Sequence, residues 1–213
     1  MRGATDLLAS WTAAAGALGA SGDVTGTGRR VLERYAEPHR AYHDIRHLRE
    51  VVSAVRLLSP YAATPAAVMV AAWLHDAVYD PRRADNEERS AGLARAALEE
   101  LGVSPPAVME VSRLVLLTAT HDPRPDDRNG AVLCDADLAV LARPTAGYVA
   151  YVSDVRREYA HVPADAFASG RTAVLRRLLG RDPLFSTDAA RDRWERRARQ
   201  NLTAELADLL GGA

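Results

Sequence analysis

The segment Ala66–Tyr79 reads AAVMVAAWLHDAVY and follows a Thr64-Pro65 pair. Threonine before proline is typical of a helix N-cap and the first helical residue, so the pair predicts a helix start. The run that follows is apolar on nearly every side, which predicts a helix buried in the middle of the fold. His75 and Asp76 stand near its C-terminal end, where two polar groups beside an apolar run need partners.

Helices are predicted on both sides of this segment. Apolar residues recur every three or four positions from Tyr42 to Leu58, which predicts an amphipathic helix carrying both His43 and His47. Glycines predict a loop near residues 19 to 28. Further helices are expected at about 6–18, 31–35, 85–101, 105–120, 145–160, 164–180 and 188–210.

Local signals sharpen several of these boundaries. Asp85 and Glu88 form a pair like a capping box, and Gly102 stands where a C-terminal cap belongs. A polar, proline-rich loop is expected from His121 to Gly130. The apolar segment 131–141 fits a short strand or a buried helix, and its helical surroundings favour the helix. The sequence therefore predicts an all-α fold of roughly eight to ten helices.

Composition limits the classes of protein to consider. A 213-residue chain that is 48% apolar can bury one large core, so a single domain over 1–213 is expected. The formal net charge of −1 argues against the basic field that gathers nucleic acid or an anionic membrane. Cys134 is the only cysteine, and no apolar run approaches the roughly 20 residues that span a bilayer. We expect a soluble cytoplasmic protein.

Metal-type side chains occur in several separate clusters. His43 and His47 are four residues apart, His75 and Asp76 are adjacent, and an apolar segment contains two carboxylates, Asp135 and Asp137. Each cluster alone fits ordinary surface or core residues, but buried carboxylates need a cation or a hydrogen-bond network. One divalent ion would satisfy several of these demands together. Imidazole and carboxylate suit Mg, Mn, Fe, Co, Ni or Zn, so the ligand types leave the metal open.

Together these motifs resemble a known family. The order of His47, His75-Asp76 and Asp137, each from a different predicted helix, resembles the H…HD…D pattern of the HD superfamily of metal-dependent phosphohydrolases, which is all-helical. The blocks YHDIRHL (42–48), WLHDAVYD (73–80), DNEERSA (85–91) and LCDADL (133–138) are similar to a bacterial branch of predicted HD phosphohydrolases. The resemblance implies a metal-site core at about 40–140, followed by C-terminal helices at about 145–210.

The resemblance also implies residue roles. The metal ligands would be His47, His75, Asp76 and Asp137. Asp135 is the alternative to Asp137 as the last ligand, and where Asp137 is the ligand Asp135 would support one by hydrogen bonding. The Tyr-His-x-x-x-His pattern is similar to that of cyclic-nucleotide phosphodiesterases and makes His43 the expected general acid.

Further site residues are expected from their positions in the sequence. Arg40 is a candidate phosphate clamp, with a solvated arginine as the alternative. His121 is a candidate to reach the cleft, either at the substrate or as a ligand of a second metal, with an exposed loop histidine as the alternative. Asn86 and Glu87 fit helix-start residues or groups that position water.

The expected activity is hydrolysis of a small phosphorylated metabolite or nucleotide with one divalent metal ion. No His-His pair follows His121, which favours a mononuclear site. No Glu-Asp pair directly follows the His75–Val78 segment, where alarmone hydrolases of this superfamily carry one, and this argues weakly against guanosine tetraphosphate as the substrate. Two alternatives remain open. One is a non-haem iron oxygenase on the same fold, and the other is a non-catalytic metal-binding module.

Overall fold

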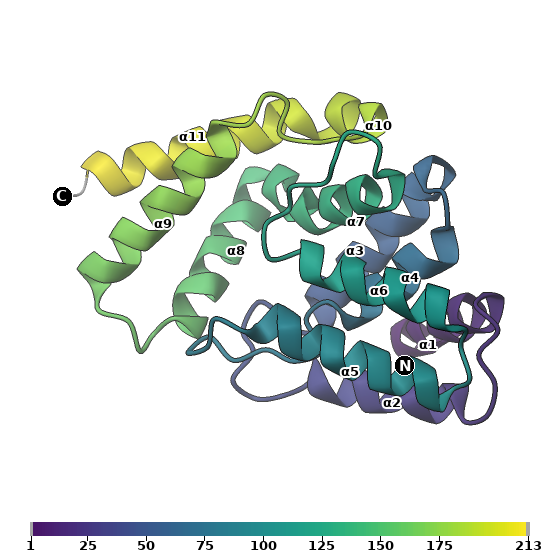
Figure 1. Ribbon diagram of the computed structural model, residues 1–213. Helices are drawn as coiled ribbons and strands as arrows, with labels where there is room; N and C mark the ends of the chain where they lie inside the picture. Colours follow the sequence, from purple (N-terminus) through teal and green to yellow (C-terminus); the bar gives the residue numbers. More distant parts are fainter. Residues whose placement is uncertain (1, 212–213) are drawn as a thin grey trace.

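The computed structural model describes residues 2–211 and contains no strand within that range. The all-α prediction is therefore confirmed. The helices are α1 (Arg2–Ala17), α2 (Val24–Arg34), α3 (Ile45–Leu58), α4 (Pro65–Leu74), α5 (Asn86–Glu100), α6 (Pro105–Leu117), α7 (Arg128–Leu138), α8 (Thr145–Glu158), α9 (Ala164–Leu179), α10 (Asp188–Ala190) and α11 (Arg196–Gly211) (Figure 1). Short 3-10 turns follow α3 and α7, and a π-helical turn joins α10 to α11.

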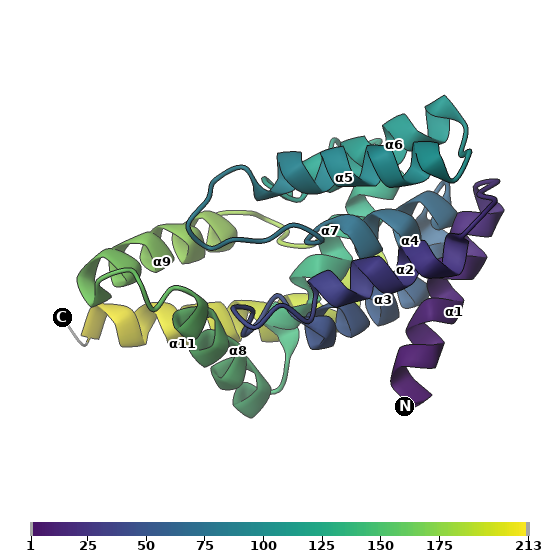
Figure 2. The same ribbon diagram turned by 90° about the horizontal axis from the view of Figure 1, so that it is seen from below.

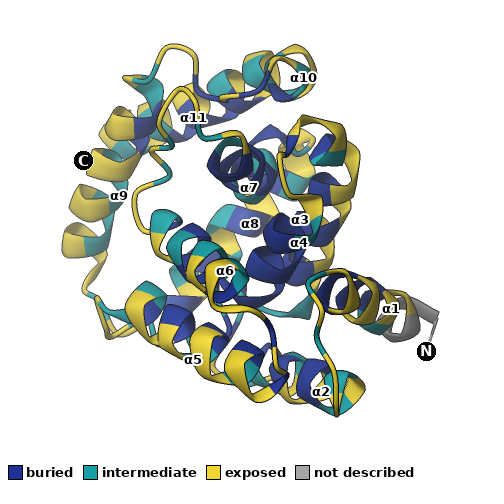
Figure 3. Cartoon of the chain, turned by 45° about the vertical axis from the view of Figure 1, so that its right-hand side comes forward, coloured by how far each residue is buried: buried dark blue, intermediate teal, exposed yellow. Residues whose placement is uncertain are grey.

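The central helix is α4, as its apolar sequence predicts. From Ala67 to Leu74 every residue is buried, and α1, α3, α6 and α7 pack around it. In Figure 3 most of α4 and α7 has the colour of buried residues, whereas α5 and α9 each have one long face in the colour of exposed residues. Pro65 occupies the first turn, and Thr64 stands at the N-cap without a side-chain capping bond. The alanines on α4 let its neighbours approach closely, and this places the chain after Leu74 in the middle of the fold.

The helix predicted to continue to Tyr79 instead ends at Leu74, which corrects the sequence interpretation. His75 is the C-cap, and residues 76–80 form turns. Side chains from outside hold these turns: Ser90 Oγ accepts from the backbone N–H of Val78 and donates to its carbonyl. Asn86 exchanges two hydrogen bonds with the backbone of Asp80. These bonds replace the helical ones and leave His75 and Asp76 in a fixed turn.

A second correction concerns His43, which lies before α3 and not on it. Helix α3 begins at Ile45 because Asp44 is its N-cap: the carboxylate accepts from the backbone N–H groups of Arg46 and His47 at 2.7 and 3.4 Å. The ring centroids of His43 and His47 still lie 5.6 Å apart. The two histidines are neighbours through the turn, not through helical spacing.

The loop predicted at residues 19 to 28 is shorter than expected. Helix α2 begins at Val24, and Asp23 caps it by accepting from the N–H of Gly26. Gly28 lies inside this helix. The position requires glycine because a Cβ there would stand 2.5 Å from Cδ1 of Trp11, which is fully buried. This glycine therefore permits a close approach of α1 and α2, and it was misread as a loop signal.

Other boundary predictions had mixed outcomes. Asp85 is at the N-cap of α5 but makes no capping bond, because both of its oxygens accept from Arg83 at 2.6 Å. Gly102 has φ of +72°, in keeping with its predicted cap role. The polar loop ends earlier than predicted, since Asp127 caps α7 through the N–H of Gly130. Segment 131–141 is helical as favoured, continuing into a 3-10 turn.

The C-terminal helices pack on one side of this bundle. Helix α9 packs on α11, and α8 and α11 both contact the turn after α7 (Figures 1 and 2). The hydrophobic core extends from Leu7 of α1 to Leu202 of α11. None of the helices within the described residues is both long and apolar enough to cross a membrane.

Candidate metal centre

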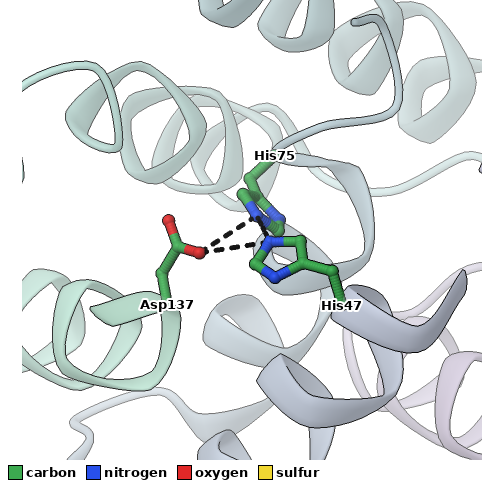
Figure 4. A group of neighbouring side chains, drawn as sticks. All are labelled: His47, His75 and Asp137. Atoms are coloured by element: carbon green, nitrogen blue, oxygen red, sulfur yellow. Dashed lines mark hydrogen bonds and ion pairs between the residues drawn. The ribbon is translucent and has the colours of Figure 1, made fainter. Parts of the chain in front are cut away.

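Three chain segments bring a His/His/Asp group together at the middle of the fold. His47 comes from the first turn of α3, His75 caps α4, and Asp137 lies near the end of α7. One ligand atom from each lies within 4.8 Å of the other two, and Figure 4 shows the two rings and the carboxylate turned toward one point. The prediction of Asp137 over Asp135 as the residue beside the histidines agrees with this arrangement.

The donor atoms are spaced as a metal shell requires. His47 Nε2 lies 3.1 Å from His75 Nε2 and 3.2 Å from Asp137 Oδ1, and His75 Nε2 lies 3.5 Å from the same oxygen. Ligands at about 2.0–2.2 Å from an ion stand about 3.0–3.5 Å from their neighbours in tetrahedral or octahedral shells. The observed spacing therefore fits a single divalent ion.

Asp76 borders the same group from a different direction. Its Oδ2 lies 3.2 Å from His47 Nε2 and 3.0 Å from His75 Nε2. Asp76 does not belong to the three-residue group whose atoms are all mutually close. Its position next to both imidazole nitrogens makes it a candidate for a fourth ligand.

The orientation of His75 is fixed by the backbone. Its Nδ1 lies 2.9 Å from the carbonyl oxygen of Ala72, which can only accept, so Nδ1 carries the proton. In the neutral ring Nε2 then presents a lone pair to the centre. A carbonyl that holds a histidine in this way is the usual support for a metal-ligating imidazole.

The electrostatics of the group also call for positive charge. Burial alone would lower the pKa of His47, but hydrogen bonds to Asp137 and Asp76 outweigh it and raise the pKa to about 9. The same two carboxylates raise the pKa of His75 despite its burial. Against burial, the histidines hold the pKa of Asp76 and Asp137 well below their ordinary values. A divalent ion provides the charge that protons on the imidazoles otherwise supply.

His121 occupies an unusual backbone conformation beside the centre. Its φ is +52°, a left-handed conformation that costs a residue with a Cβ on the order of 1–2 kcal/mol. Arg181 holds the segment by donating to the carbonyls of Thr120 and His121 at 2.6 and 2.7 Å. His121 Nε2 is 2.7 Å from Asp137 Oδ2, so it contacts the carboxylate oxygen that does not face His47. His121 thus lies in the cleft, where it orients Asp137.

His43 forms a pair with a residue that the sequence analysis gave no role. Its Nδ1 lies 2.7 Å from Glu158 Oε2, and its ring stacks on Tyr79 with centroids 4.0 Å apart. Glu158 Oε1 accepts from the backbone N–H groups of residues 41, 42 and 43, and the Tyr79 hydroxyl donates to Oε2. The sequence signal was a glutamate on the buried face of α8, in register with Tyr151 and Val155.

Glu158 stays ionised despite its burial. Burial raises its pKa, but the hydrogen bonds from His43 and from the backbone outweigh this and lower the pKa to about 2. An ionised carboxylate only accepts, so Nδ1 of His43 carries a proton. Nε2 is then the nitrogen of His43 at which a proton can be exchanged with a bound molecule.

Arg40 does not fit the predicted phosphate clamp. Its side chain is 0% exposed, and it donates to Glu37 and to the backbone carbonyls of His43, Asp76 and Ala77 at 2.7–3.3 Å. The guanidinium therefore fastens the His43 turn to the His75-Asp76 turn. Its role is to hold two parts of the site together, and its donors are already bonded to the protein.

The predicted support role of Asp135 is also wrong. This buried carboxylate accepts from the N–H groups of Ser186 and Thr187 and from the Thr187 hydroxyl, each at 2.7 Å. It therefore ties α7 to the start of α10, and these hydrogen bonds go to Ser186 and Thr187 and not to a proposed metal ligand. Asn86, the first residue of α5, holds the turn at Asp80 through two hydrogen bonds, which is a structural role. Glu87 beside it lines the cavity at the metal group.

A cavity of about 380 Å³ opens onto the centre and is lined mainly by polar side chains, among them His43, Asp76, Glu87, Thr118, His121 and Asp137. We call it the polar cavity. Asp76, Glu87 and Asp137 place three carboxylates at this cavity, beside Arg83, whose guanidinium is paired with Asp85. A metal ion at the centre would offset the charge of Asp76 and Asp137 when the imidazoles are neutral. The same centre borders a second cavity of about 400 Å³ through His47 and Asp137.

Comparisons with known proteins found no match to this chain. No family model matches the chain, and neither a curated protein nor a solved structure matches it. The fold and the site define an all-α protein with a buried His/His/Asp group that can hold a metal ion. This arrangement is compatible with an HD-type fold and with metal-dependent catalysis.

Proposed function

We propose that this protein is a metal-dependent phosphohydrolase of the HD type, cleaving a phosphoester of a small phosphorylated metabolite or nucleotide. The observation that carries the proposal is the spacing at the wall of the polar cavity. The Nε2 atoms of His47 and His75 lie 3.1 Å apart, and each lies 3.0–3.5 Å from a carboxylate oxygen of Asp76 and of Asp137. The H…HD…D order of these residues supports the same assignment.

The four residues would hold one divalent ion. An ion bound there supplies Lewis acidity, which acidifies water and offsets the charge of a phosphate. That positive charge would offset the carboxylates of Asp76 and Asp137 at the wall of the polar cavity and so favour an anionic substrate. Ligand chemistry leaves the choice among Mn, Fe, Mg, Co, Ni and Zn to experiment.

His43 is the proposed general acid. Glu158 holds its Nδ1, and Nε2 remains for proton transfer at the edge of the polar cavity. In the proposed reaction the oxygen of water bonds to phosphorus, and the bond from phosphorus to the ester oxygen breaks. The Nε2 proton passes to that oxygen, giving an alcohol and inorganic phosphate. One water proton leaves to solvent, from which His43 is protonated again.

The test is phosphate release from a panel of phosphoesters by protein loaded with each metal in turn. We expect release that depends on the metal, and a His43→Gln variant with kcat lowered by about 100-fold or more at unchanged metal content. The matched control is His161→Gln, because His161 is exposed and lies outside the polar cavity. Metal-loaded, folded protein that releases no phosphate from any ester would refute the proposal.

A further inference from the structure

A third cavity, which is apolar, adjoins the candidate site. It has a volume of about 470 Å³ and is lined chiefly by residues of α8 and α9 together with Tyr42, namely Tyr42, Tyr151, Val155, Phe167, Gly170 and Val174. We call it the apolar cavity. Its size is that of a small-molecule site, and its walls are of the kind that bind flat or bulky apolar groups.

The apolar cavity borders the polar one. His43 and Tyr159 line both of them. A molecule that places its phosphate in the polar cavity and its ester oxygen at His43 Nε2 therefore directs the rest of its leaving group toward the apolar cavity. The residue proposed to protonate the leaving group is the residue at which the two cavities meet.

One wall of the apolar cavity is held rigidly. The rings of Tyr42 and Tyr151 meet edge to face with centroids 4.7 Å apart, and both residues are buried. Arg171 lies over the Tyr151 ring and donates to its hydroxyl at 3.2 Å. A wall fixed before binding loses little side-chain entropy when a ligand packs against it.

The charges at the rim of the apolar cavity are already compensated. Arg171 donates to both carboxylate oxygens of Glu205 at 2.6 and 3.0 Å, and His43 is paired with Glu158. A charged group entering this cavity would lose hydration without gaining an unpaired partner among these residues. The cavity therefore selects an uncharged occupant, in contrast to the polar cavity beside it.

We propose that the apolar cavity binds the leaving group, so that the substrate is a phosphoester of an alcohol with an uncharged, apolar body of aromatic size. A phosphorylated sugar would be a poor substrate because its hydroxyl groups would be buried there without partners. This inference rests on the proposed phosphohydrolase function, and it names the class of substrate for the same site.

Gly170 offers a way to fill the apolar cavity without disturbing the fold. It lies on the exposed side of α9, and a Cβ added there meets no atom within 4 Å. Gly170→Leu therefore places an isobutyl group at the cavity. Gly92→Leu is the matched control, because Gly92 is also exposed in a helix, has nothing within 4 Å of an added Cβ, and lines neither cavity.

The experiment compares kcat/KM of the metal-loaded protein for 2-naphthylmethyl phosphate, ethyl phosphate and glycerol 3-phosphate. We expect the naphthylmethyl ester to be preferred by roughly 10- to 100-fold, as burying on the order of 100 Å² of apolar surface implies. Gly170→Leu should remove most of this preference, while Gly92→Leu should keep it. Binding of the naphthylmethyl ester is measured in parallel by ligand-observed NMR.

The outcomes separate the two proposals. Phosphate release from all three esters without a preference, or a preference that survives Gly170→Leu, overturns the leaving-group assignment and leaves the phosphohydrolase intact. If no ester is hydrolysed, the phosphohydrolase fails, and the binding measurement decides the cavity. The apolar-cavity assignment is supported if wild type and Gly92→Leu bind naphthylmethyl phosphate and Gly170→Leu does not. It is overturned if wild type does not bind this ester.

Discussion

Replacing Glu158 by glutamine tests how the His43 turn is built. The carboxylate accepts three backbone N–H groups, the Tyr79 hydroxyl and His43 Nδ1. An amide oxygen can keep the backbone bonds, but the amide NH₂ cannot accept from Tyr79 or from a protonated Nδ1. We therefore expect Glu158→Gln to destabilise the protein at neutral pH.

The size and pH dependence of the effect follow from the pKa of Glu158. The folded protein lowers this pKa from 4.5 to about 2. That difference corresponds to about 3 kcal/mol of stability. Because folding depresses the pKa, the stabilisation is fully present above the unfolded value of 4.5 and is lost as the pH falls through about 2. Glutamine does not titrate, so the gap between wild type and variant should close over this range.

The assay is urea denaturation of both proteins at pH 7, 5, 4 and 3. The gap in the free energy of unfolding should be about 3 kcal/mol at pH 7 and should shrink by about 1.4 kcal/mol per pH unit below pH 4.5. Glu33→Gln, at an exposed position of α2, is the control and should change stability by less than about 0.5 kcal/mol throughout. A gap that stays constant from pH 7 to pH 3 would refute the reasoning.

Three further predictions concern packing, the turn contacts and the metal. Gly28→Ala should lower the free energy of unfolding by about 2 kcal/mol, because its Cβ would stand 2.5 Å from Cδ1 of the buried Trp11. The control Gly16→Ala, whose Cβ meets nothing within 4 Å, should not destabilise the protein. Equal effects of the two changes in thermal unfolding would contradict this account. Arg40→Met should lower the free energy of unfolding by about 3 kcal/mol, whereas a phosphate clamp would change only KM. Calorimetry in two buffers should show metal binding releasing protons, with affinity falling as the pH drops below the His47 pKa of about 9; affinity independent of pH would argue against imidazole ligands.

The features that the sequence predicted well are those set by local periodicity. The apolar run of Ala66–Leu74 predicts a buried helix. Which of the histidine and aspartate motifs meet was implied by the resemblance to the HD superfamily and not by periodicity. His47, His75 and Asp137 come together as expected because each lies on or at the end of a helix packed around α4. Helix packing therefore turns a spacing pattern into a site.

The features that were missed depend on long-range contacts. Nothing local distinguishes Arg40 as a buried group, because the carbonyls it bonds lie up to 37 positions away. Glu158 meets the His43 turn across 115 positions, and Gly28 is glycine because of Trp11 on another helix. The end of α4 was misplaced for the same reason, since Ser90 and Asn86 hold the turn from another helix.

The most direct test of the central claim is the metal content of the purified protein after exposure to Mn, Fe, Co, Ni, Zn and Mg. We expect about one ion per chain in wild type, and loss of that ion in folded Asp137→Asn and Asp76→Asn variants. Asp208→Asn, a change at an exposed position of α11, should retain it. Folded wild-type protein that binds no ion, or an ion that survives both ligand substitutions, would contradict the assignment of the metal centre.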